Sequence, residues 1–256
     1  NFTINIKTKN PQILLEGRSF EIKDIQANVA LKSLINDQFL IDDMQITTKE
    51  INIKDIIGLL RVFQNSSKLF FLDTIVKDGF VIVNLNLSFD KKGNIKENYK
   101  IKGSVKKAKV NILNQVKLQN LNFNFDINKS IYSLKQIDMK LNNIKATSSL
   151  IEIIKKKNLF FVNGEFLTDK KNFDIKEFKS IFFTLFDDKN IKKIEFSSKN
   201  NFSFNLNEGL KLDNFKVKST VSLDQLIVNQ KSLKLKSYFP HFVDEIKLED
   251  HKIVIN

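Results

Sequence analysis

Residues 79–89 read GFVIVNLNLSF, and this stretch decides the fold class. Val81 and every second residue up to Phe89 are apolar, while Asn84, Asn86 and Ser88 occupy positions between them. Successive side chains of a strand point to opposite faces, so one face of this segment is apolar and the other largely polar. Such alternation is typical of an antiparallel sheet with one solvated side.

The same alternation recurs along most of the chain. It is found in residues 25–31, 99–105, 121–127, 202–206 and 215–223. Turn-forming residues separate the segments at 90–94, 128–130 and 207–209. The sequence therefore predicts a mainly β fold built from a long, mostly antiparallel sheet.

A loose internal repeat runs through these segments. Strand ends at Phe89, Phe125 and Phe204 are each followed, 12 to 14 residues later, by an apolar residue and then a lysine. This spacing indicates a hairpin reused along the chain, as in a solenoid-like array. An antiparallel meander without true repetition is the alternative.

Two stretches follow a helical period instead. Apolar residues recur at helical spacing over residues 54–77, with a break near Asn65-Ser66-Ser67, which predicts two short amphipathic helices. Residues 175–187 predict a further short helix. We expect these helices to cap or fill the sheet. The run Leu159–Val162 predicts a strand buried on both faces.

Composition and motifs argue against several classes of function. The net charge is +13, but only Arg18 and Arg61 are arginine, and base recognition favours the bidentate fork of arginine over lysine. We therefore expect no nucleic-acid partner. The chain has no cysteine, and His241 and His251 lie ten residues apart, without the spacing that places two metal ligands on one helical face.

Catalytic signals are also weak. The seven glycines are never closer than ten residues, which excludes a P-loop or a dinucleotide fingerprint in its usual spacing. Adjacent acidic residues occur near predicted turns or element ends, where solvation explains them, whereas a catalytic pair needs one pocket with unlike environments. These pairs are Asp42-Asp43, Asp187-Asp188, Asp244-Glu245 and Glu249-Asp250. We expect a protein that is not an enzyme and that holds no cofactor or metal.

The apolar face is the remaining candidate site. An exposed apolar surface of this extent needs a cover, which a second sheet, short helices or an apolar ligand could supply. The face is rich in Phe, Ile, Leu and Val and offers few hydrogen-bonding groups, which suits an aliphatic chain better than a polar metabolite. We predict that the following residues line a lipid-binding groove: Val81, Val83, Leu85, Leu87, Phe89, Tyr99, Ile101, Leu121, Phe123, Phe125, Phe202, Phe204, Phe215 and Val217.

In these features the chain resembles the AsmA-like and TamB-like envelope proteins of Gram-negative bacteria. The resemblance rests on residues 79–89 and the Lys-Gly turn after them, on residues 99–105, and on the recurrent Phe-x-Phe strands. It also includes Tyr238–Phe242, leading to Asp250–Ile253. The resemblance implies long, twisted sheets curled into an open hydrophobic groove. Members of that family are thought to pass phospholipids between the inner and outer membranes.

The resemblance also implies a domain organisation and a location. We expect residues 1–256 to form one continuous β-groove segment of a longer protein, because the chain opens with Asn1 in an alternating pattern. The expected location is the periplasm, with an inner-membrane anchor and membrane contacts supplied by a segment outside this chain. Phospholipid acyl chains are the expected partner, and no partner protein is identified. The alternative is a structural or interaction module, either a closed sandwich or a β-solenoid spacer, with no lipid ligand.

Overall fold

The protein is described by a computed structural model, and the described part is discontinuous. It comprises residues 3–15, 17–30, 41–63, 66–112, 116–141, 144–173, 191–209, 211–229, 235–241 and 245–255. The predicted helix over residues 175–187 lies outside these ranges.

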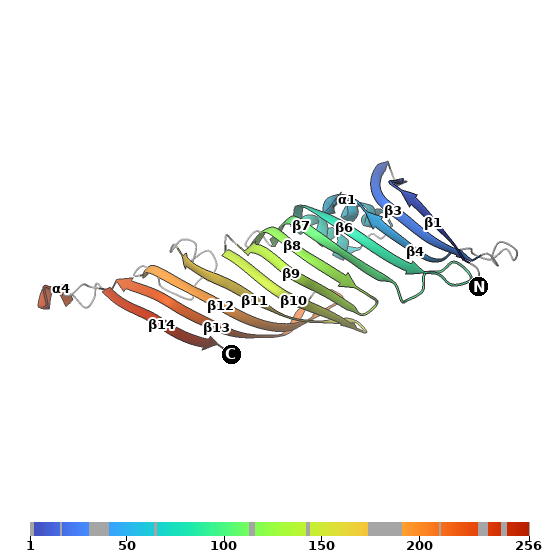
Figure 1. Cartoon of the computed structure of the whole chain (residues 1–256). Helices are drawn as coiled ribbons and strands as arrows, with labels where there is room; N and C mark the ends of the chain where they lie inside the picture. The colour runs from blue at the N-terminus through green and yellow to red at the C-terminus, as the bar shows by residue number, and fades with distance from the viewer. Residues whose placement is uncertain are drawn as a thin grey trace.

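One long sheet dominates the described part of the chain (Figure 1). Its strands are β1 (Thr3–Lys9), β2 (Gln12–Leu15), β3 (Arg18–Ala30), β4 (Ile41–Thr48), β5 (Ile51–Asn52), β6 (Val76–Ser88), β7 (Lys100–Ile112), β8 (Val116–Ile127), β9 (Ile131–Leu141), β10 (Ile144–Lys156), β11 (Leu159–Phe173), β12 (Ile191–Asn207), β13 (Leu212–Asn229) and β14 (Glu245–Ile255).

Strand order follows chain order along the whole sheet. The path runs β1-β3-β4-β6-β7-β8-β9-β10-β11-β12-β13-β14, with β2 beside β3 and β5 beside β6. Every strand pair between described residues is antiparallel. The predicted mainly β, antiparallel fold is therefore confirmed, and the topology is an open meander rather than a solenoid coil or a closed sandwich.

The two helices predicted over residues 54–77 are present. They are α1 (Ile53–Phe63) and α2 (Ser67–Ile75), and Ser66 caps α2 by accepting a hydrogen bond from the Leu69 amide at 3.3 Å. A further short helix, α4 (Leu235–Tyr238), precedes β14. Between described elements, extensive contacts join only sheet neighbours, apart from α1 and α2, which contact each other and the β5–β7 region.

Side-chain capping explains why the predicted turns form where they do. The Asp90 carboxylate accepts hydrogen bonds from the amides of Lys92 at 2.8 Å and Asn94 at 2.9 Å. A hydrogen bond from the Asn94 side chain, followed by those from the two amides, lowers the pKa of Asp90. Asn128 and Asn207 cap their turns in the same way, through the amides of residues 130, 131 and 211. Asn and Asp favour such turns because their short side chains bond to nearby backbone amides.

β-Bulges bend the strands and adjust the alternation. Lys107 on β7, Asn120 on β8 and Gln136 on β9 adopt φ values of 52°, 49° and 53°, and the register shifts beside each of them. A bulge inserts one residue into a strand, bends it and increases its twist. The bending of the strands along their length is visible in Figure 1.

Each bulge also keeps the apolar residues on one face. On β9, Leu134 and Ile137 are three residues apart, yet each pairs with a residue on the apolar side of a neighbouring strand. Gln136 is the extra residue of β9 relative to β8. The pairing of β9 with β10 continues without a register shift, so Gln136 lies opposite residue 149. The apolar face therefore continues across the line of bulges.

The sheet curves toward its apolar face. Ile144 on β10 belongs to one packed cluster with Phe196 on β12 and Leu223 on β13, although β11 lies between β10 and β12. Side chains of non-neighbouring strands converge in this way on the inner side of a bend. The segment 159–162 departs from its prediction, because Leu159 is 41% exposed and lies on the outer, polar face.

We predict that the left-handed backbone at Lys107 penalises β-branched residues. Replacing Lys107 with Val should lower the free energy of unfolding by about 1–2 kcal/mol, because a side chain branched at Cβ crowds the backbone at positive φ more than the unbranched lysine does. The measurement is the denaturation midpoint in urea. The matched control is Lys100→Val, an exposed lysine on the same strand at ordinary strand geometry, which should be neutral or slightly stabilising. Equal effects of the two substitutions would contradict the assignment of the bulge.

A second prediction concerns the glycines beneath two phenyl rings. A Cβ at Gly103 would collide with the Ile82 carbonyl oxygen and the Phe125 ring, whereas one at Gly164 would meet only side chains, Ile151 and Phe202, at 2.9 Å. Gly103→Ala should therefore cost more stability than Gly164→Ala, by about 1–2 kcal/mol, because backbone relaxes less readily than a side chain. Urea denaturation of both variants tests the ranking, and the opposite order would disprove it.

Candidate apolar binding face

The candidate site is the continuous apolar face on the inner side of the sheet. Cross-strand partners share a face of an antiparallel sheet, so the register defines its members. One row of partners crosses the sheet from β6 to β13 and consists of Val83, Gly103, Phe125, Leu134, Ile151, Gly164, Phe202 and Val217. A parallel row consists of Leu85, Ile101, Ile127, Tyr132, Ile153, Val162 and Phe204.

The register places the predicted groove residues of β6, β7, β8, β12 and β13 together on this face. Each lies on one of the two rows or at an alternate position of the same strands. Two predicted residues lie just outside the named strands. Tyr99 immediately precedes β7, and Phe89 follows β6, where it forms an isolated bridge with Ile95.

The face also extends beyond the predicted residues. On β3 and β4 it continues through Ala27 and Met44, and on β1 through Ile6, as the pairing of these strands shows. On β14 it continues through Leu248 and Ile253, which pair with Leu226 and Val221 of β13. Strong alternation marks these positions in the sequence, so they could have been included in the prediction.

Helix α1 already covers the part of the face that lies on β6 and β7. Ile53 and Ile56 pack against a buried cluster that contains Val81, Val105 and Ala108. Val81 is only 8% exposed as a result of this packing and that of its neighbours. The prediction that short helices fill part of the sheet is confirmed here, and Val81 is less accessible to a ligand than the residues farther along β6.

Strands β11 to β13 carry a run of phenyl rings on the same face. Phe166 stacks on Phe202 with centroids 5.2 Å apart, Phe202 lies 6.0 Å from Phe204, and Phe204 lies 6.2 Å from Phe215. Phe215, at the end of the run, is 58% exposed. The rings therefore form a continuous apolar surface that is partly open to solvent.

A polar cluster interrupts the face, and the sequence interpretation missed it. The Thr168 and Ser198 hydroxyls lie 2.8 Å apart, and the Asn200 amide donates to the Ser198 hydroxyl at 2.8 Å. The Ser148 hydroxyl is buried and has no hydrogen-bond partner among the described residues. The expectation of a face with few hydrogen-bonding groups therefore holds along the phenyl run but not at this cluster. The position of Asn200, two residues before Phe202, was the signal in the sequence.

Two lysines converge on one aromatic ring at the edge of the face. Lys155 on β10 pairs with Phe160 on β11, and its ammonium lies 5.8 Å from the centroid of that ring. The ammonium of Lys68 on α2 lies 5.8 Å from the same centroid. Tyr132 packs edge-on against Phe160, with ring centroids 6.4 Å apart. Burial, and secondarily the proximity of Tyr99, raises the pKa of the Tyr132 phenol, which stays protonated at neutral pH.

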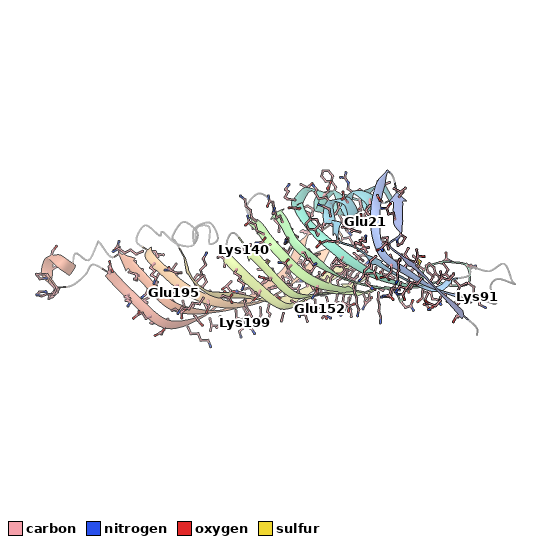
Figure 2. All side chains as sticks on the ribbon, turned by 45° about the horizontal axis from the view of Figure 1, so that its top comes forward. Glu21, Lys91, Lys140, Glu152, Glu195 and Lys199 are labelled. Atoms are coloured by element: carbon pink, nitrogen blue, oxygen red, sulfur yellow. The ribbon has the colours of Figure 1, made fainter. Side chains whose placement is uncertain are left out.

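The opposite face is polar along the sheet (Figure 2). The labelled Glu21, Lys140, Glu152, Glu195 and Lys199 come from strands β3, β9, β10 and β12 and share this face by register. Many of its lysines pair with acidic residues of neighbouring strands. Examples are Lys199–Glu165 at 3.0 Å, Lys109–Asp78 at 3.1 Å and Lys102–Asp126 at 3.5 Å. Exposed pairs of this kind contribute little stability individually, and they balance part of the basic charge locally.

The residues that the structure describes contain no group of three or more His, Cys, Asp or Glu side chains arranged to hold a metal ion. No helix among them combines the length and the apolar character needed to cross a bilayer.

Comparisons of the chain with protein-family models, with curated proteins and with solved structures found no match.

Proposed function

We propose that this chain is a non-enzymatic segment of an envelope protein that shelters phospholipid acyl chains on the apolar face of its open sheet. The observation that carries the proposal is a single apolar face, continuous in register from β1 to β14, over which no second sheet packs in the described part of the chain. Apolar surface of this extent is unfavourable in water and needs a partner.

The dimensions of the face suit a lipid. Adjacent strands lie about 4.8 Å apart, so the path from β6 to β13 alone covers roughly 30 Å, longer than one acyl chain. Each buried CH₂ contributes about 0.8 kcal/mol, so one chain of ordinary length gains on the order of 10 kcal/mol before ordering costs. The hydrophobic effect is not directional, and a lipid can therefore slide along such a surface without a specific motif.

In the proposed role, the sheet acts as a passive shield. Acyl chains lie on the inner face, head groups remain in water at the rim, and the polar outer face contacts the aqueous periplasm. Transport between the inner and outer membranes would then use membrane contacts made outside this chain. The resemblance to AsmA-like and TamB-like proteins supports this part of the proposal.

An interaction module is the second candidate, and the edges of the sheet favour it. Strands β1 and β14 end the strand path, each pairs on one side only among the described residues, and both are exposed along most of their length. An unpaired strand edge can add a strand from another polypeptide. In that case, a protein partner rather than lipid would cover the apolar face.

The first test of the proposed function is chemical. Organic extracts of the purified chain, examined by mass spectrometry, should contain phospholipid in amounts comparable to the protein. Extracts of a cysteine-free soluble protein prepared in parallel provide the background. Absence of lipid above that background, with a bound polypeptide in its place, would favour the interaction module.

The second test introduces a charge on either face of the same strands. Leu85→Asp and Phe125→Asp should sharply reduce co-purified lipid, because a carboxylate on the inner face must be dehydrated when a chain binds. The expected loss of stability is modest, about 1–3 kcal/mol, because both side chains are only partly buried.

Matched controls are available one residue away. Asn84→Asp and Asn124→Asp add the same charge on the polar face of β6 and β8 and should leave bound lipid unchanged. Equal lipid content in all four variants, measured by the same extraction, would contradict a lipid site on the inner face. Complete unfolding of the inner-face variants alone would instead indicate that other side chains of the protein already cover these positions.

A further inference from the structure

A cationic site, which we call the station, lies at the rim of the apolar face and consists of Lys68, Lys155 and Phe160. Lys155 and Phe160 are cross-strand partners at the ends of β10 and β11 nearest the turn between them, and Lys68 approaches from α2. The three residues thus come from three elements, and the sequence separation between Lys68 and Lys155 gave no sign that they meet.

The two ammonium groups have no acidic partner in the described part of the chain. The ion pairs there involve other basic residues, including Lys54 and Arg61 of the neighbouring helix, both of which pair with Asp73. The first turn of α2 also carries no acidic residue, so Lys68 adds to the positive end of the helix dipole instead of offsetting it. The station therefore concentrates positive charge that the described residues leave uncompensated.

Apolar surface begins directly beside this charge. Phe160 pairs with Leu206 of β12, and the next inward row holds Tyr132, Ile153 and Val162. Tyr132, whose ring packs edge-on against Phe160, adds a phenol O–H to this region as a hydrogen-bond donor. A ligand that fits both parts has an anionic oxygen-rich head and an aliphatic body.

We propose that Lys68 and Lys155 bind the phosphate of a lipid whose acyl chains lie on the apolar face, with Phe160 as the boundary between head and chains. The proposal deepens the proposed function and rests on it. It names the residues that hold the phosphate and the position at which the head group leaves the shielded surface.

Lys156 provides an internal contrast. It is the next residue after Lys155, and its ammonium lies 5.4 Å from the ring of Phe161. By alternation, Lys156 and Phe161 lie on the polar face, where Ile154 and Phe161 are partners. Lys156 therefore offers the same side chain and the same type of aromatic contact on the face opposite to the proposed acyl chains.

The test compares two fluorescent lipids with identical acyl chains, phosphatidylglycerol and diacylglycerol, presented to the whole chain in neutral detergent micelles. The native sequence should bind phosphatidylglycerol about tenfold more tightly, because charge-assisted contacts to phosphate are added to the same apolar burial. Lys68→Ala combined with Lys155→Ala should abolish that preference and leave diacylglycerol binding unchanged. The preference should also weaken in about 0.5 M NaCl through screening.

Two paired variants serve as controls. Lys156→Ala combined with Lys157→Ala removes the same net charge at positions that follow Lys155 directly in the chain and should retain the preference. Lys68→Arg combined with Lys155→Arg should also retain it, because guanidinium groups bind phosphate as well. If replacing Lys156 and Lys157 abolishes the preference as fully as replacing Lys68 and Lys155 does, the preference depends on net charge and not on the station. That result overturns the proposal.

The remaining outcomes distinguish a failure of the phosphate station from a failure of acyl-chain sheltering. Equal binding of both lipids by the native chain overturns the phosphate station and leaves acyl-chain sheltering intact. Binding of neither lipid overturns both. Inorganic phosphate, added as a competitor, should not displace phosphatidylglycerol at millimolar concentration, because it lacks acyl chains. Displacement at concentrations similar to the lipid's own Kd would identify free phosphate as the ligand and overturn the lipid assignment.

Discussion

The structure depends on keeping the apolar side chains of every strand on the same side of the sheet. In an antiparallel sheet the residues of a pair share a face. The face occupied by Val83 on β6 therefore fixes the face of Gly103 on β7, and Gly103 in turn fixes that of Phe125 on β8. A slip of one residue between any two strands would bring lysine and asparagine onto the inner face. The curvature, the polar outer face and the proposed sites all follow from this shared register.

The bulges show how the constraint is met while the strands bend. A bend requires extra residues on some strands, and an extra residue normally reverses the face of everything beyond it. At Lys107, Asn120 and Gln136 the left-handed residue is itself the extra one, so the alternation resumes on the correct side. These three are long or polar side chains that project into solvent, where a positive φ carries no packing penalty beyond its local cost.

The polar outer face and the apolar inner face of the sheet differ in how their side chains are bonded and covered, and this difference bears on function. Polar side chains on the outer face bond to one another through amide hydrogen bonds and cross-strand ion pairs. Asn124 with Gln136 and Lys199 with Glu165 are examples. The inner face has α1 over Val81 and Val105, but the run from Phe166 to Phe215 leads to a partly open end. A surface that works by the hydrophobic effect needs shape and continuity more than fixed chemical groups. The weakness of motifs in this chain is therefore compatible with the proposed role.

The sequence by itself determined the class of fold, the turns at Asp90, Asn128 and Asn207, the break between α1 and α2, and the face on which most site residues lie. Local chemistry encodes all of these, because strand alternation, amide capping and helical periodicity each act within a few residues. The sequence did not show β9 and β10 as clearly, because the bulge at Gln136 interrupts the alternation on β9 and an irregularity between Thr147 and Ile151 interrupts it on β10. Only the tertiary structure decided which strands neighbour one another, that the sheet stays open, and that Lys68 meets Lys155 at Phe160. Those features depend on residues far apart in the chain, whose approach is set by the summed twist and bending of the strands between them.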